Sequence, residues 1–183
     1  LETAETGHLV LATVHTNTAA TTIDRVIDKF PSSRQNQIRT MLSYSLKGVI
    51  AQTLCRSTMG GRIAAFEVLV VTVPVANHIR DGKTYMIPSV MQTSKSIGMQ
   101  TFSDELTRLV LEGKITAEEA YIKAIDKEEL RIAFNNTGVH IDFLDHVDAQ
   151  DAAERLKVAQ THINEIRERL AHDPNDVNML NDL

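Results

Sequence analysis

The amino-acid sequence predicts an α/β fold, because short apolar runs with strand character alternate with segments of helical spacing. Residues His8–Val14 are an apolar run with two β-branched valines, which is typical of a strand buried on both faces of a sheet. A polar turn follows, and hydrophobic residues then recur at helical spacing, which predicts a helix over Thr18–Lys29. Arg62–Val73 is rich in Val and Ile, and is predicted to form a strand or a hairpin pair.

The segments between these runs carry helix and turn signals. Apolar residues at helical spacing predict one long helix over Ser32–Leu54. Gly60 and Gly61 indicate a turn before the second apolar run. After that run, Thr72 is expected to cap a short helix over Pro74–Asp81.

Cap signals define the helices that follow. A helix over Asp104–Glu112 is expected to begin at Thr101 or Ser103. The Thr116–Glu119 segment has the form of a capping box, with Thr at the N-cap and Glu three residues later. Asp126–Phe134 is predicted to be a further helix that the next four residues, ending in a glycine, would break.

The composition limits the class of protein. The chain has 183 residues, 43% hydrophobic and 23% charged, which suits one globular domain or a domain with a tail. A net charge of −5 gives no electrostatic footprint for nucleic acid. The lone Cys55 allows neither an intramolecular disulfide nor a cysteine-based metal site, and it fits a reducing compartment. No apolar run approaches the roughly 20 residues that span a bilayer, and no signal peptide is visible. Because the first residue is Leu1 and not Met, we expect that this start is not native and that the chain is a fragment of a longer protein.

The best candidate for chemistry is His15, which directly follows the first predicted strand. In open α/β sheets, ligands bind outside the carboxyl ends of the strands, so this histidine would stand at such a position. The alternative is a histidine that is satisfied within an ordinary turn. The sequence has no G-x-x-x-x-G-K-[ST] phosphate loop, no G-x-G-x-x-G motif and no histidine pair with metal-ligand spacing.

A longer pattern around this histidine resembles a known family. The run AETGHLVLATVHTNTAATTIDRVIDKFP, residues 4–31, is very close to the His box of the secretion ATPases, and in particular of the type IV pilus retraction ATPases, the twitching motility PilT family. The resemblance continues in the same order and spacing through IRTMLSYSLKGVIAQTL, GGRIAAFEVLV, NHIRDGK and SVMQTSKSIGMQTFSDELTRLVLEGKIT. Because it extends over most of the chain, it is far more specific than a single box.

The resemblance implies roles for the residues of the His box. His15 matches the histidine that faces the γ-phosphate of ATP, and His8 matches a second histidine with a more structural role. Thr16 and Asn17 would shape the turn. Imidazole suits such a sensor because it can donate a hydrogen bond to phosphate.

Two further groups of residues match family motifs at interfaces. Asp24 and Arg25 match the family's IDR motif, for which we expect a structural or subunit-interface role; the alternative is a surface ion pair. VPVANHIRD, residues 73–81, aligns with the family's AIRNLIRE-like motif and retains Asn77, Arg80 and Asp81. Ala76 and His78 replace the Arg and Leu of that motif, so these positions depart from the family pattern.

The resemblance also implies the architecture. The fold would be a RecA-like P-loop NTPase core followed by an all-helical C-terminal region. Residues 1–83 would be the C-terminal portion of that core, residues 84–138 a helical subdomain, and residues 139–183 an accessory helical tail. The tail is predicted from its amphipathic spacing and lies beyond the part that resembles the family.

The implied activity is that of an ATP-hydrolysing hexameric motor that powers pilus retraction and twitching motility. ATP and Mg²⁺ would be held by Walker A and Walker B segments that the family carries upstream of the part matched here, so we expect the 183-residue fragment to be inactive by itself. The implied partners are five further copies in a homo-hexamer and the inner-membrane pilus platform protein, without nucleic acid. The implied location is the cytoplasm, at the inner face of the cytoplasmic membrane.

Two alternatives remain open on the sequence alone. A pilus assembly or type II secretion ATPase is expected to carry a paired-cysteine zinc insertion near Cys55. Here Cys55 is followed by a short linker, Arg56–Gly61, without a second cysteine, which favours the retraction branch. The other alternative is a non-catalytic domain that oligomerises or docks on a partner.

Overall fold

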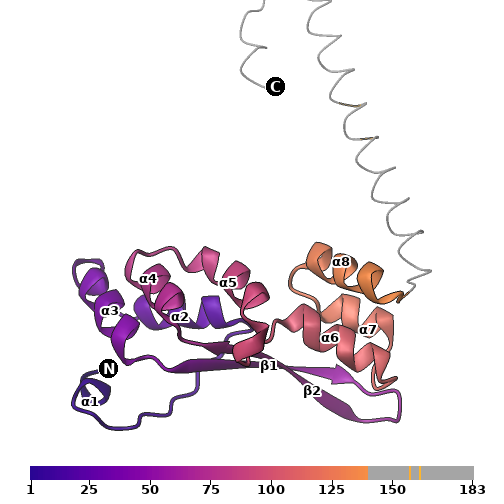
Figure 1. Ribbon diagram of the computed structural model, residues 1–183, viewed down its shortest axis with the longest axis horizontal. Coiled ribbons are helices and arrows are strands. Elements are labelled where there is room, and N and C mark those ends of the chain that lie inside the picture. Colours follow the sequence, from indigo (N-terminus) through magenta and orange to yellow (C-terminus); the bar gives the residue numbers. More distant parts are fainter. Residues whose placement is uncertain (140–156, 158–160, 162–183) are drawn as a thin grey trace, which may run out of the picture. The chain divides into compact units, whose positions relative to one another are not determined.

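The computed structural model describes residues 1–139 together with Lys157 and Thr161 (Figure 1), so the tail predicted for residues 139–183 lies almost wholly outside the described residues. Residues 1–140 form one compact unit. Its elements are α1 (Glu2–Glu5), α2 (Ala19–Ile27), α3 (Ser32–Ser45), β1 (Gly48–Arg56), β2 (Arg62–Val70), α4 (Val73–Arg80), η1 (Thr84–Met86), α5 (Ile87–Thr93), η2 (Lys95–Ile97), α6 (Phe102–Leu111), α7 (Ala117–Lys123) and α8 (Lys127–Thr137).

The centre of the unit is a long antiparallel hairpin of β1 and β2. Its register runs from Gly48 opposite Val70 to Arg56 opposite Arg62. Gly60 and Gly61 at its tip have positive φ angles of 90° and 75°, which glycine adopts without strain. The predicted Gly-Gly turn and the predicted second strand are therefore confirmed.

The prediction of one helix over Ser32–Leu54 is wrong, because α3 ends at Ser45 and β1 begins at Gly48. Leu46 already has an extended backbone, with ψ 130°. Gly48 and the β-branched residues after it favour a strand over a helix. On β1 the burial alternates with a period of two, so that Ala51 and Cys55 are buried while their neighbours are exposed.

Helices cover one face of the hairpin (Figure 1), and α2 and α7 contact β1 while α6 contacts β2. The residues of the hairpin that face these helices include Ala51, Cys55, Ala65 and Leu69, all buried. The main apolar cluster joins α2, α3, α4 and α5 through buried side chains such as Ile23, Ile27, Leu42, Val75, Ile79, Ile87 and Met91. Burial of this apolar area is the dominant favourable contribution to folding.

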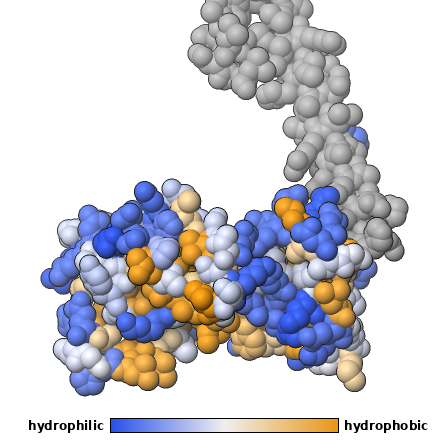
Figure 2. Space-filling model, in the orientation of Figure 1, coloured by the Kyte–Doolittle hydropathy of each residue, from blue (hydrophilic) through white to orange (hydrophobic). Residues whose placement is uncertain are grey.

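The predicted buried strand His8–Val14 is not formed: the segment is extended backbone without strand pairing, and its residues are exposed. Leu9 and Leu11 are 85% and 87% exposed. A strand needs a neighbour to pair its N–H and C=O groups, and no strand among the described residues runs beside this segment. Figure 2 shows hydrophobic surface at the lower left, where the N-terminal stretch of the chain runs.

The starts of the helices in this unit largely agree with the N-cap positions that the sequence predicts. Thr18, Thr72, Thr101, Thr116 and Asp126 are the N-caps of α2, α4, α6, α7 and α8. The capping box at α7 is only half formed, because the Thr116 hydroxyl accepts from the Glu119 N–H at 3.1 Å while the Glu119 carboxylate accepts from the Arg56 N–H at 2.8 Å. Helix α8 continues to Thr137, about a turn beyond the predicted end, and Gly138 closes it with φ 71°. No helix within the described residues has the length and apolar character that crossing a bilayer requires.

Candidate functional site at the His15 turn

The candidate site is the turn from His15 to Thr18, which joins the extended N-terminal segment to α2. The imidazole of His15 is exposed, so it is free to meet a ligand and is not packed into the interior. Thr18 caps α2 by accepting a hydrogen bond from the Thr21 N–H at 3.0 Å. The exposed position fits the predicted sensor, although no strand end supports the turn as the sequence predicted.

Threonine hydroxyls hold the turn against the first turn of α2. The Thr22 hydroxyl donates to the Thr18 carbonyl oxygen at 2.6 Å, and it also lies 2.6 Å from the Thr16 hydroxyl oxygen. Since the Thr22 proton is directed to Thr18, Thr16 is the donor in the second bond. Thr16 is therefore hydrogen-bonded to the first turn of α2, whereas Asn17 is exposed beside it.

The second histidine of the motif is separate from this turn. His8 is exposed at the start of the extended segment, and its Nδ1 lies 3.0 Å from the Thr6 hydroxyl oxygen. The two histidines are thus not brought together as ligands of one group. Among the described residues, no three His, Cys, Asp or Glu side chains gather where they could hold a metal ion.

The Asp24 carboxylate connects α2 to the short helix η1. It accepts a hydrogen bond from the hydroxyl of Thr84, which is buried, at 2.8 Å. Arg25 is exposed on the same helix, so the two residues face different surroundings. A packing role for Asp24 follows from this contact.

The predicted residues Asn77, Arg80 and Asp81 lie together at the end of α4. The Arg80 guanidinium donates to the Asn77 side-chain oxygen at 2.7 Å and lies 3.8 Å from the Asp81 carboxylate. Side chains that are 42% and 49% exposed make an ion pair worth at most about 1 kcal/mol. This cluster is on a different element from the His15 turn.

One residue next to the site was missed by the sequence analysis. Glu67, on β2, is 9% exposed, and its carboxylate accepts a hydrogen bond from the Ala19 N–H, the first residue of α2, at 2.6 Å. Burial raises the pKa of the Glu67 carboxyl, and the N–H groups of Ala19 and Phe102 partly offset this shift. The only sequence signal was a lone charge within the apolar run 63–73.

The single cysteine, Cys55, is not part of this turn, and its thiol is unreactive. Cys55 is fully buried on β1, and burial raises the pKa of its thiol. The residues after it form the tip of the hairpin, so the short linker noted in the sequence is a β-turn region.

Comparison with known proteins decides the family. The profile of the type II/IV secretion system protein family matches residues 1–123. The chain belongs to this family. It is 48% identical over 124 residues to the type IV pilus retraction ATPase PilT of Pseudomonas aeruginosa, and 44% identical over 131 residues to a twitching motility protein of Neisseria gonorrhoeae. These matches cover 68% and 71% of this chain.

A solved structure supports the same relationship. The pilus retraction motor PilT, crystallised with bound ADP, matches with a TM-score of 0.63 and 42% identity over 71% of this chain. The resemblance to retraction ATPases and the predicted secretion-ATPase fold class are therefore confirmed. The chain spans 36% and 35% of the length of the two sequence relatives, and 37% of the solved chain.

Proposed function

We propose that this chain is part of an ATP-hydrolysing hexameric motor that powers type IV pilus retraction and twitching motility. The observation that carries the proposal is the 48% identity to the retraction ATPase PilT over 124 residues, together with the family profile, whose match over residues 1–123 includes the whole His15 turn. The complete protein would bind ATP with Mg²⁺ between subunits. It would work at the inner face of the cytoplasmic membrane, on the membrane-embedded platform of the pilus.

His15 is the residue that senses the γ-phosphate in this proposal. Its exposed imidazole can donate one hydrogen bond to a phosphate oxygen, and hydrolysis removes that acceptor. Among the described residues no three or more His, Cys, Asp or Glu side chains gather to hold a metal ion, and in this proposal other segments of the complete protein would hold Mg²⁺ and the phosphates. Thr16 and Asn17 would keep the turn in shape, and His8 would have a structural role at the start of the extended segment.

The movement of the turn would pass to the subunit interface through two groups of residues. Asp24 is bonded to Thr84, so α2 carries η1 with it, and Arg25 is exposed on α2 for a contact with a neighbouring subunit. Asn77, Arg80 and Asp81 present an exposed polar cluster at the end of α4, which packs on α3. Both groups suit a ring in which each subunit reads the nucleotide state of the next.

The test is a His15→Ala substitution in the full-length protein. We expect the hexamer to form and the rate of ATP hydrolysis to fall by about 10²-fold, the loss typical of removing one hydrogen-bond donor to a developing charge. Twitching should stop. His78→Ala, which changes a histidine on α4 outside the turn, is the matched control and should leave both activities intact. Normal twitching by the His15 variant would contradict the proposal.

A further inference from the structure

The buried carboxylate of Glu67 lies near the starts of α2 and α6. In the sequence, more than half of the residues of the compact unit lie between these two helices. On β2 it occupies the helix-covered face, in the row of buried residues with Ala65 and Leu69. It accepts a hydrogen bond from the backbone N–H of Ala19 at 2.6 Å, and the backbone N–H of Phe102 is close enough to lower the pKa of the Glu67 carboxyl. These are the first residues of α2 and of α6.

The first N–H groups of a helix have no acceptor within the helix, and the helix dipole places partial positive charge there. The two N-cap threonines do not accept from the first N–H of their helices. The Thr18 hydroxyl accepts from the N–H of Thr21 and the Thr101 hydroxyl accepts from the N–H of Asp104, in each case from the third residue of the helix. The Glu67 carboxylate thus completes the start of α2 with a hydrogen bond, and it lies near the first N–H of α6. A neutral side chain of similar size would form a weaker bond with the start of α2.

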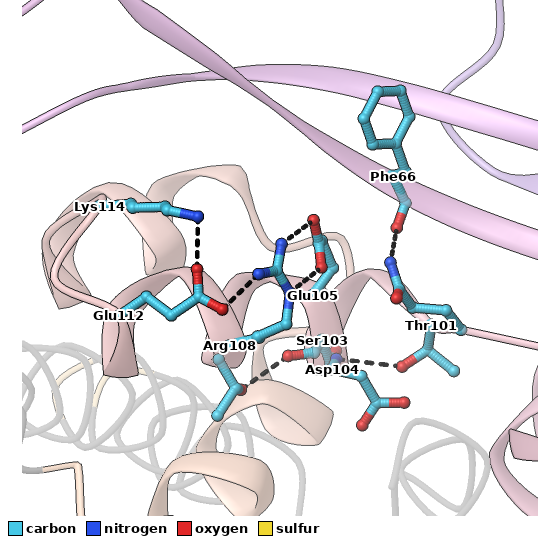
Figure 3. A network of polar contacts seen from close by, with 10 residues as sticks. Phe66, Thr101, Ser103, Asp104, Glu105, Arg108, Glu112 and Lys114 are labelled. Atoms are coloured by element: carbon cyan, nitrogen blue, oxygen red, sulfur yellow. Dashed lines mark hydrogen bonds and ion pairs between the residues drawn. The ribbon is translucent and has the colours of Figure 1, made fainter.

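Helix α2 starts directly after the His15 turn, so Ala19 moves with that turn. Helix α6 is tied to the strand that carries Glu67, because Gln100 pairs with Val68 through two backbone hydrogen bonds of 2.9 and 3.0 Å. The Gln100 amide also donates to the Phe66 carbonyl oxygen at 2.8 Å (Figure 3). A displacement of Ala19 would therefore also displace the start of α6, because the strand that carries Glu67 connects the two.

A row of ion pairs joins side chains along helix α6. The Arg108 guanidinium donates two hydrogen bonds of 2.8 and 2.9 Å to the Glu105 carboxylate and a further one to Glu112, which also pairs with Lys114 (Figure 3). Bidentate pairs of this kind fix side-chain geometry. Because α6 also packs against α7 and α8, its start and the helices beyond it move together.

We propose that Glu67 is a positioning residue that couples the His15 turn to the helical C-terminal half of the unit, because its carboxylate bonds the N-terminus of α2 while its strand pairs with Gln100 just before α6. The inference rests on the proposed function, since it describes how the state of the nucleotide at that turn reaches α6. Glu67 does not touch the nucleotide in this scheme. Its substitution therefore changes the coupling and leaves ATP binding in place.

The test compares Glu67→Gln with Glu119→Gln in the full-length hexamer. Glu119 is a matched control because it is also 9% exposed and accepts a backbone N–H, that of Arg56, but it joins β1 to α7. Hydrogen exchange is measured at the amides of residues 102–104 with ADP and with a non-hydrolysable ATP analogue. Steady-state kinetics and twitching are measured on the same proteins.

We expect the nucleotide-dependent difference in exchange at the start of α6 to fall by about tenfold in Glu67→Gln, the effect of losing a charge-assisted hydrogen bond. KM for ATP should stay within about twofold while twitching falls, since the lost interaction is remote from the nucleotide. Glu119→Gln should match the wild type. Ala19→Pro, which removes only the α2 donor at a position where proline is tolerated, is a second variant and should reproduce the loss.

The inference is overturned if Glu67→Gln or Ala19→Pro retains the wild-type difference at α6, or if Glu119→Gln loses it equally. A wild type that shows no nucleotide-dependent difference at α6 overturns it as well. The proposed function is tested separately, because it fails if the His15→Ala variant twitches normally.

Discussion

At the scale of single residues, the contribution of Glu67 to the free energy of unfolding depends on pH. Burial raises the pKa of its carboxyl, and the nearby Glu129 carboxylate adds to this effect. The folded protein therefore binds this proton more tightly than the unfolded chain, in which glutamate titrates near 4.3. By linkage, the contribution of Glu67 to the free energy of unfolding falls as the pH rises from about 4.3 through the raised pKa of the folded state.

The corresponding prediction concerns Glu67→Gln, which removes the titrating group. We expect the free energy of unfolding of the wild type, measured by urea denaturation, to decrease relative to that of the variant between about pH 4.5 and pH 7. Glu119→Gln serves again as the comparison for a buried carboxylate. A wild-type stability that rises relative to the Glu67 variant over this range would contradict the assignment of the proton to Glu67.

At the scale of elements, the caps explain which parts of the fold could be predicted. Thr18, Thr101 and Thr116 each start a helix where the sequence indicated, because a cap is a local interaction between a hydroxyl and an N–H a few residues away. Thr72 also precedes its helix as predicted, but its side chain makes no capping hydrogen bond. The start of α2 is also fixed by Glu67, which accepts the Ala19 N–H from 48 residues further along the chain. No local pattern could have revealed that contact.

The errors at this scale have the same origin. The apolar residues between Leu46 and Leu54 fit a helical face as well as a strand, and the pairing of β1 with β2 decides in favour of the strand. Conversely, the segment His8–Val14 has the composition of a strand, but no partner strand lies beside it among the described residues. Strand formation is decided by neighbours, so composition alone predicted one strand too many and one too few.

The α7 cap provides a prediction at the element scale. Thr116→Ala removes the hydroxyl that accepts from the Glu119 N–H at 3.1 Å, and we expect a loss of about 1 kcal/mol in the free energy of unfolding. Because the Glu119 carboxylate accepts the Arg56 N–H, the loss should also loosen the end of β1. Thr93→Ala, which removes an exposed hydroxyl that bonds only to carbonyl oxygens of its own helix, is the control for chemical denaturation. Equal losses in the two variants would contradict a capping role.

At the scale of the whole molecule, the compact unit exposes apolar surface on the side away from its helices. Ile50, Leu54 and Phe66 project from the uncovered face of the hairpin and are 71%, 43% and 38% exposed. Ile50 lies opposite Val68 and Leu54 opposite Ala64, so these side chains form one continuous face. An exposed apolar face of this kind is typical of a surface that other segments of a larger assembly cover.

The absence of a phosphate loop from the 183-residue sequence determines the nucleotide affinity that we expect for this chain. Its sequence has no G-x-x-x-x-G-K-[ST] loop, so the phosphate contact left to it is His15. One hydrogen bond between a side chain and a charged group contributes about 1.5–3 kcal/mol, whereas a dissociation constant of 1 mM requires about 4 kcal/mol. We therefore expect isothermal titration of this chain with Mg-ATP to show no binding tighter than about 1 mM, while the full-length protein binds. Micromolar binding by the 183-residue chain would mean that its own residues form a phosphate site, and it would contradict the placement of the phosphate cradle outside them.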